Sequence, residues 1–172
     1  MKRLAALAPL TALLLLIVLF AGWSLRRSPQ VTPMALVGRP LPDLVLPRLA
    51  DGARTPLRSS VRPGPALVNF YASWCAPCIE EAPALMALKA EGVKIVGVAY
   101  KDAPAAAAGF LTRFGDPYAQ TLVDRDGRGG VEFGVTGVPE TYAVDATGVI
   151  RAKHAAPITA ATAEALLQAA AR

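Results

Sequence analysis

The two cysteines of this 172-residue chain lie three positions apart, between two segments of predicted regular structure, and this arrangement constrains the fold more than any other feature. They occur in the segment Trp74-Cys75-Ala76-Pro77-Cys78. The preceding run, Ala66–Tyr71, is almost continuously apolar, as is typical of a central strand covered on both faces. Residues 75–89 have helical spacing, with Pro83 as an expected kink. The sequence therefore predicts a strand–turn–helix unit with both cysteines in the first helical turn.

The rest of the chain completes an α/β pattern. A strand at 43–46 and a partner at 55–57 flank the turn signal Asp51-Gly52, which predicts a hairpin. Asp102 is a possible N-cap for a helix at 104–114, and Thr159 for a final Ala-rich helix at 159–171. Further strands are expected at 93–100, 121–123, 141–144 and 149–152. Two βα units, a hairpin and a last helix predict a mixed central sheet with helices on both faces.

A C-x-x-C pair alone fits a redox site, a zinc site or a structural disulfide. Zinc needs four ligands, but the chain has no other cysteine and a single histidine, His154, for which the simplest expectation is a surface position near the last strand. A disulfide that closes a four-residue loop adds little stability, because stabilisation grows with loop length. The spacing and position therefore favour a redox pair and no metal site.

The helix N-terminus suits thiol–disulfide exchange. Unpaired backbone N–H groups and the helix dipole stabilise a thiolate on Cys75, which we expect to be exposed and nucleophilic. Cys78, one turn further in, would be shielded and would resolve the mixed disulfide. Pro77 stiffens the first turn without the loss of a hydrogen bond. Trp74 would shield the pair, although an ordinary packing role is open.

An uncharged, apolar run from Leu4 to Leu25 precedes the α/β pattern. Its 22 residues would span about 33 Å as a helix, enough for a bilayer core of about 30 Å. We therefore expect a signal anchor at 1–27, a Pro-containing tether at 28–38 and a domain at 39–172, with the domain translocated. The small residues that a signal peptidase needs are not well placed around Ala21, but a cleaved signal peptide and a buried soluble helix are alternatives.

The net charge of +5 comes mainly from the flanks of this run. Lys2, Arg3, Arg26 and Arg27 lie there, and the other 14 basic residues nearly balance 13 acidic ones. The basic pI therefore reflects membrane flanks and predicts no nucleic-acid partner.

The segment 69–78, Asn-Phe-Tyr-Ala-Ser-Trp-Cys-Ala-Pro-Cys, resembles the active site of the thioredoxin superfamily. Three further segments are more specific: 78–81 (Cys-Ile-Glu-Glu), 97–102 (Gly-Val-Ala-Tyr-Lys-Asp) and 134–142 (Gly-Val-Thr-Gly-Val-Pro-Glu-Thr-Tyr). Together, the four segments resemble the DsbE/CcmG branch of that superfamily, the membrane-tethered thioredoxins of cytochrome c maturation. The resemblance spans roughly residues 36–157 and implies a thioredoxin-like fold.

The resemblance also implies roles for residues around the cysteines. Pro139 would be a cis-proline against the pair, with the Val138 backbone free to bind a substrate peptide; a trans turn proline is the alternative. Glu81 shares a helical face with Cys78 and, if buried, could accept its proton; a solvated surface acid is the alternative. Glu140 would lie near the pair and tune it, unless it is an ordinary edge charge.

The function that this resemblance implies is reduction. A thiol–disulfide oxidoreductase on the periplasmic side of the inner membrane would reduce the C-x-x-C-H disulfide of apocytochrome c, or of a maturation partner, before haem attachment. A DsbD/CcdA-type membrane electron transporter would re-reduce it, with no cofactor beyond the Cys75–Cys78 disulfide. A tethered reductant of other periplasmic thiols, or a metal or haem chaperone on the same fold, are the alternatives.

Overall fold

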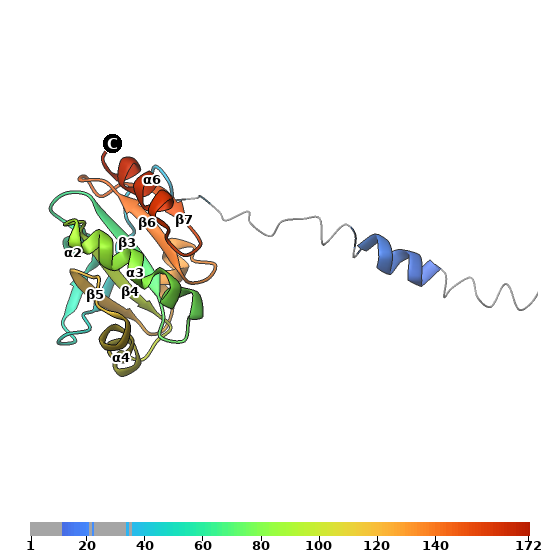
Figure 1. Cartoon of the computed structure of the whole chain (residues 1–172), viewed down its shortest axis with the longest axis horizontal. Coiled ribbons are helices and arrows are strands. Elements are labelled where there is room, and N and C mark those ends of the chain that lie inside the picture. The colour runs from blue at the N-terminus through green and yellow to red at the C-terminus, as the bar shows by residue number, and fades with distance from the viewer. Residues whose placement is uncertain (1–11, 21, 23–33, 35) are drawn as a thin grey trace, which may run out of the picture. The chain divides into compact units, whose positions relative to one another are not determined.

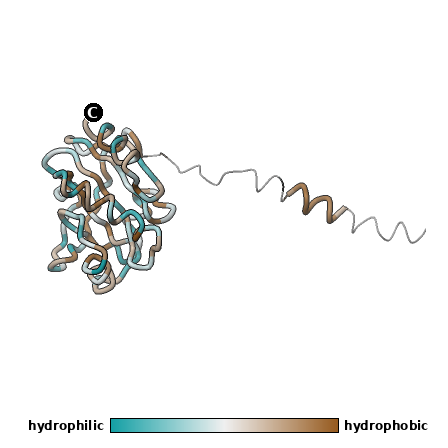
Figure 2. The backbone as a smooth tube through the Cα atoms, in the orientation of Figure 1, coloured by the Kyte–Doolittle hydropathy of each residue, from teal (hydrophilic) through white to brown (hydrophobic). Residues whose placement is uncertain are grey.

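The computed structural model describes residues 12–20, 22, 34 and 36–172, which belong to two compact units, Met1–Thr32 and Pro33–Arg172. In the first unit, residues 12–20 and 22 are helical, and residues 12–20 are uniformly apolar (Figure 2). Most of the predicted anchor and tether, namely residues 1–11, 21, 23–33 and 35, lies outside the described residues. Among those described, none forms a helix with the length and apolar character that a membrane span requires.

The second unit is built on one mixed five-stranded sheet, with strand order β5-β4-β3-β6-β7 (Figure 1). The first three of these strands along the chain run parallel, and the last two add antiparallel neighbours on the other side of β3. Their bounds are β3 Ala66–Tyr71, β4 Ile95–Tyr100, β5 Gln120–Asp124, β6 Glu140–Val144 and β7 Ile150–His154. All six residues of β3 are buried, which confirms the predicted central strand.

A separate hairpin lies before this sheet. β1 (Val45–Pro47) pairs with β2 (Arg54–Pro56) as the turn signal at Asp51-Gly52 predicts. Arg48, just after β1, bridges to Leu122 of β5. The short helix α2 (Leu57–Val61) follows directly and is not expected from the sequence, because five residues carry too little periodicity to be recognised.

Alternate side chains of the sheet divide the core into two layers. Leu67, Tyr71 and Ile95 face the layer that contains side chains of α3, α4 and α6. Val68 and Phe70 face the opposite layer, with side chains from the hairpin, α2 and α5. The helix bounds are α3 Ala76–Ala90, α4 Pro104–Phe114, α5 Arg128–Phe133 and α6 Ala160–Ala170. Helices on both faces are therefore confirmed.

The helix ends confirm one predicted cap and correct another. Thr159 caps α6, since its hydroxyl accepts a hydrogen bond from the Thr162 N–H. At α4 the N-cap residue is Ala103, and Asp102 is not the cap because its carboxylate binds elsewhere, as described below. Two further features were not predicted: α5 follows the turn after β5, and the Arg62–Pro63 peptide bond is cis.

Candidate active site

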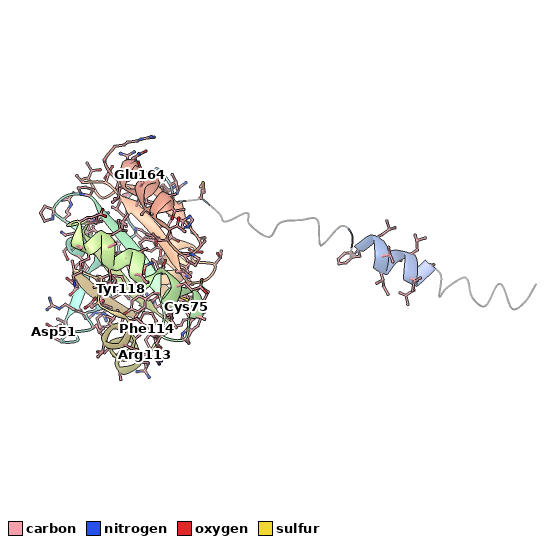
Figure 3. The ribbon with its side chains drawn as sticks, viewed as in Figure 1. Asp51, Cys75, Arg113, Phe114, Tyr118 and Glu164 are labelled. Atoms are coloured by element: carbon pink, nitrogen blue, oxygen red, sulfur yellow. A yellow bond between two sulfur atoms is a disulfide. The ribbon has the colours of Figure 1, made fainter. Side chains whose placement is uncertain are left out.

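The cysteines lie where the chain passes from the central strand to the long helix α3, as the sequence predicts. Cys75 is the N-cap residue of α3, and its sulfur accepts a hydrogen bond from the Cys78 N–H at 3.2 Å. The two sulfurs form a disulfide. In Figure 3, Cys75 lies at the end of the α3 ribbon. Cys75 Sγ already accepts a hydrogen bond from this N–H of the helix. After reduction, the same N–H would stabilise a thiolate on Cys75.

The burial of the pair differs from the expectation. Cys75 is only 4% exposed in the disulfide, against 2% for Cys78, so the prediction of an exposed Cys75 is wrong for the oxidised state. In the disulfide the Cys75 sulfur lies 3.4 Å from the Val138 carbonyl oxygen. Trp74, in contrast, is 60% exposed, which rules out an internal packing role; its indole N–H donates to the Lys101 carbonyl at 3.3 Å.

The loop before β6 supplies the contact above the disulfide. The Val138–Pro139 bond is cis, so the cis-proline that the resemblance implies is present and the trans alternative is wrong. A disulfide sulfur carries no proton, and the approach of Cys75 to the Val138 carbonyl is therefore a van der Waals contact. A Cys75 thiol at the same place would have this carbonyl within reach as an acceptor.

Glu81 is buried beneath the pair on the same helix as Cys78. It is 1% exposed, which excludes the solvated surface alternative. Its Oε1 accepts from Asn69 Nδ2 at 2.9 Å, and its Oε2 accepts from the Ile158 N–H at 3.0 Å. Burial raises the pKa of Glu81 to about 7, and the two hydrogen bonds oppose that rise. Near neutral pH, the protonated and ionised forms of the Glu81 carboxyl are therefore similarly populated.

Three further polar residues complete a buried network around Glu81. Asn69 of β3 also donates to Thr141 Oγ1 at 3.0 Å, and its Oδ1 accepts from the Tyr118 hydroxyl at 2.7 Å. The roles of these three residues were not predicted from the sequence. The sequence feature that points to such a network is Asn69 itself. An amide inside a strand buried on both faces requires hydrogen-bond partners for all its polar atoms.

Glu140 is also buried, at 1% exposure, so the edge-charge alternative is wrong. Its carboxylate accepts from the Thr136 N–H and hydroxyl and from the Tyr142 hydroxyl, and it pairs with Lys153 at 2.9 Å. Strand alternation places its side chain with Tyr142 in the layer opposite the cysteines. The structure therefore does not bring the carboxylate to the face of the redox pair, as expected by resemblance, and the nearby ammonium compensates its charge.

Asp102 is the residue whose predicted place requires the largest correction. It is 5% exposed, and its carboxylate accepts from the Ser73 N–H at 2.6 Å, the Ser73 hydroxyl at 2.9 Å and the Ala103 N–H at 2.9 Å. These bonds tie the end of β4 to the loop that carries Cys75. Asp102 thus fixes the redox loop and does not cap α4 as predicted.

The described residues contain no group of three or more side chains suited to hold a metal ion. His154 ends β7 and is half-buried, so it is less exposed than the simple surface position that the sequence suggests. Pro77 lies exposed in the first turn of α3.

The comparisons with known proteins agree with this geometry. The Redoxin family matches residues 36–167. The chain is 40% identical over 153 residues to the thiol:disulfide interchange protein DsbE of Pseudomonas aeruginosa, covering 89% of this chain and 84% of that protein. It is 43% identical over 136 residues to the thiol:disulfide interchange protein HelX of Rhodobacter capsulatus, covering 78% and 76%. A thio-disulfide isomerase from Thermus thermophilus superposes with a TM-score of 0.64 at 29% identity, covering 79% of this chain and 98% of that one.

Proposed function

Because the chain belongs to the Redoxin family, within the DsbE group of thiol:disulfide interchange proteins, we propose that it is the membrane-anchored periplasmic reductant of apocytochrome c. It is a protein-disulfide oxidoreductase with a thioredoxin-like fold. The observation that carries the mechanistic part of the proposal is the position of Cys75, between the helix N–H of Cys78 and the Val138 carbonyl.

The proposed reaction starts from the reduced protein. The Cys75 thiolate attacks one sulfur of the substrate disulfide, forms a mixed disulfide and releases the other substrate sulfur as a thiolate that takes a proton from water. The Cys78 thiol then loses its proton to Glu81 and attacks Cys75 Sγ. The second substrate sulfur leaves as a thiolate that takes a proton from water, and the Cys75–Cys78 disulfide forms. Two electrons pass from the protein to the substrate, which gains two thiols.

The exposed surface around the pair suits an extended peptide. Trp74 and Pro77 are exposed beside the disulfide, and Val138 is half-buried with its carbonyl at Cys75. We propose that the Val138 backbone pairs with the substrate chain while Trp74 contacts its side chains. Pro139, as the cis residue, shapes this loop, and Pro77 stiffens the turn between the cysteines.

Apocytochrome c is the proposed substrate because its C-x-x-C-H segment must be reduced before haem attachment, and an oxidising periplasm closes that pair. A DsbD/CcdA-type membrane transporter would return electrons to the Cys75–Cys78 disulfide, which is the only redox group that the proposal requires. The name of the Rhodobacter relative, a thiol:disulfide interchange protein, supports the exchange reaction.

The substrate prediction concerns preference among disulfide peptides. The reduced protein is expected to reduce an oxidised C-x-x-C-H peptide faster than a peptide of the same composition with the cysteines further apart, since a short strained loop is more oxidising. Stopped-flow tryptophan fluorescence would follow the reaction, and haem staining of a deletion strain would test it in cells. Equal rates with both peptides, together with normal c-type cytochromes in the deletion strain, would favour a reductant of other periplasmic thiols.

The anchoring prediction concerns residues 4–25. An uncharged helix of that length should hold the protein in the membrane, so the full chain is expected to resist carbonate extraction and to leave its domain open to periplasmic protease. Leu16→Arg should weaken this anchoring and increase the extracted fraction, because a charge near the middle of a span costs about 3 kcal/mol. Glu164→Arg, on the exposed α6 surface, is the control. A soluble mature protein that begins near Gly22 would instead establish a cleaved signal peptide.

A further inference from the structure

Tyr118 is a buried residue outside the redox motif that reaches the active-site network. It lies between α4 and β5 and is 6% exposed. Its hydroxyl donates to Asn69 Oδ1 at 2.7 Å, and Asn69 Nδ2 donates to Glu81 Oε1 at 2.9 Å. A phenol 40 positions from Cys78 in sequence is therefore joined to Glu81 through one intervening amide.

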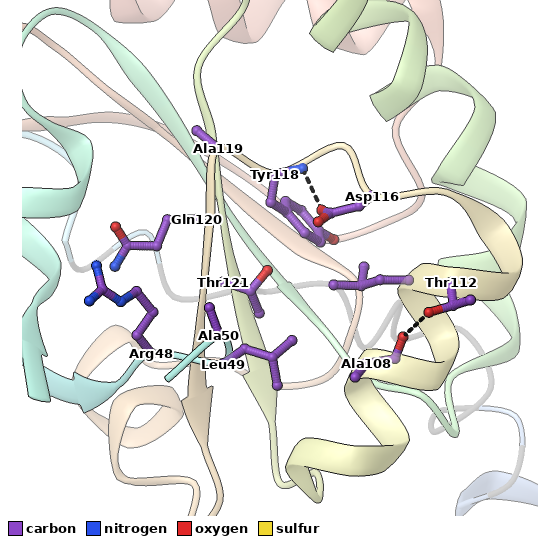
Figure 4. A pocket seen from close by; sticks show the side chains of 11 residues that line it. Arg48, Leu49, Ala50, Ala108, Thr112, Asp116, Tyr118, Ala119, Gln120 and Thr121 are labelled. Carbon is purple, nitrogen blue, oxygen red and sulfur yellow. Dashed lines mark hydrogen bonds between the residues drawn. The ribbon is translucent and has the colours of Figure 1, made fainter. Parts of the chain in front are cut away.

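Two ring contacts and one backbone hydrogen bond hold Tyr118 in place. A Cβ at Gly97 of β4 would lie 2.7 Å from the ring, so the absence of a side chain at that position creates the space. The Tyr71 ring stacks on it at 5.0 Å between centroids. The backbone N–H of Tyr118 donates to Asp116 Oδ1, as Figure 4 shows, where Tyr118 also lines a pocket beside α4. The position of the hydroxyl is thus fixed by packing.

The chemistry of the three side chains fixes the orientation of the amide. A carboxylate only accepts hydrogen bonds, so Asn69 must present Nδ2 to Glu81 while Glu81 is ionised. The other Nδ2 hydrogen goes to Thr141 Oγ1. Oδ1 then faces Tyr118, whose hydroxyl must donate. Without that donor, a rotated amide would present Oδ1 to Glu81, and this arrangement favours the protonated acid, which can donate to it.

The groups that face Glu81 come from several elements. Asn69 of β3 and the Ile158 N–H before α6 bind its carboxylate directly. Thr141 of β6 and Tyr118 before β5 reach it through Asn69, and Cys78 precedes it by three residues on α3. Within the described part of the chain, no basic side chain forms an ion pair with Glu81. Hydrogen bonding, not a counter-charge, is therefore what opposes the cost of burying its carboxylate.

We propose that Tyr118 is a positioning residue for the redox site, whose hydroxyl locks the Asn69 amide so that one of its N–H groups faces and stabilises the Glu81 carboxylate. The inference deepens the proposed role of Glu81 and rests on it for its functional meaning. The effect on ionisation, however, belongs to the folded protein itself and can be measured without any substrate.

The test is Tyr118→Phe in the oxidised full chain, with the ionisation of Glu81 followed by its side-chain carboxyl ¹³C shift. Loss of the hydroxyl is expected to raise the midpoint of the Glu81 titration by about one pH unit, since the rotated Asn69 amide no longer donates its charge-assisted hydrogen bond to Glu81. Tyr71→Phe is the matched control, because it removes a buried phenol hydroxyl from the stacked ring while the Asn69 side chain keeps its bonds to Glu81, Thr141 and Tyr118. A second variant is Gly97→Ala, whose Cβ would lie 2.7 Å from the Tyr118 ring and displace it, and which should shift the midpoint in the same direction.

An unchanged Glu81 midpoint in Tyr118→Phe, with the fold retained, would overturn the inference. The same measurement separates it from the proposed function. If the midpoint rises but the pH dependence of mixed-disulfide resolution does not follow it, Tyr118 positions Glu81 as inferred and Glu81 is not the proton acceptor. If both move upward together, the positioning role and the acceptor role are supported at once.

Discussion

Cys75→Ser is expected to abolish disulfide exchange, whereas Cys78→Ser should retain the first attack and accumulate a mixed disulfide with the substrate. The reason is the position of Cys75 as the N-cap residue of α3, where the Cys78 N–H already points at its sulfur. A thiolate stabilised there attacks, while Cys78 is one turn inside the helix. Non-reducing gel electrophoresis after incubation with an oxidised C-x-x-C-H peptide would show the trapped species.

The reduced wild-type protein provides the companion measurement. Cys75 is expected to be alkylated faster than Cys78 at neutral pH, because only its thiolate is stabilised by the helix N-terminus. Both cysteines are almost fully buried in the disulfide, so exposure in the oxidised form does not distinguish them. The difference in alkylation rate must therefore come from their ionisation in the reduced form. Tandem mass spectrometry of the reduced wild-type protein gives the rate at each cysteine. A mixed disulfide trapped by Cys75→Ser would reverse the assignment of Cys75 as the attacking cysteine. Equal alkylation rates would contradict the selective stabilisation of its thiolate.

The parts of the fold that the sequence predicts are those with strong periodicity or a local chemical signal. The apolar run 66–71, the helix at the cysteines and the cap at Thr159 all belong to this class. The short helices α2 and α5 do not, because five or six residues give no clear period. The hydrophobic pattern of the sequence therefore identifies the central strand and the long helices but not the short helices.

The candidate site shows the same division between local and long-range information. Spacing from Cys78 predicts the inward direction of Glu81, but its partners Asn69 and Ile158 come from other elements. Asp102 is adjacent to a predicted helix start and was expected to cap it, yet it binds Ser73, 29 positions away in sequence. Contacts of this kind depend on how β3 and β4 pair, which no local pattern contains.

Glu81→Gln is expected to slow resolution of the mixed disulfide by about 10²-fold, at the lower end of what general acid–base assistance contributes. A glutamine cannot take a proton, so Cys78 would have to lose its proton to water, which the burial of the site impedes. Attack by Cys75 should change less, because Glu81 adjoins the resolving cysteine in the helix. Single-turnover quenched-flow kinetics would separate the two steps. Glu80→Gln, on the exposed side of the same helix, is the matched control.

The same pair of variants tests the ionisation of Glu81 through stability. Its pKa is raised from an ordinary 4.5 to about 7, so the folded protein holds this proton more tightly than the unfolded chain does. Wild-type protein should therefore lose stability as the pH rises between those values, by on the order of 3 kcal/mol from this group. Above about pH 7 the loss should be complete, and below 4.5 it should be absent.

Glu81→Gln removes this titration, because an amide stays neutral throughout. The unfolding free energy of the variant, measured in denaturant, should increase relative to that of wild type as the pH rises from 4.5 to 7. Above pH 7 the difference between the two should stay constant. Whether the variant is more or less stable than wild type at low pH depends on how the glutamine amide accommodates two donors. Asn69 Nδ2 and the Ile158 N–H both donate to the Glu81 carboxyl. The slope of the difference, not its offset, is therefore the measure of a buried ionising Glu81. A difference that is flat with pH, alongside resolution as fast as in Glu80→Gln, would mean that Glu81 neither ionises in this range nor takes the proton from Cys78.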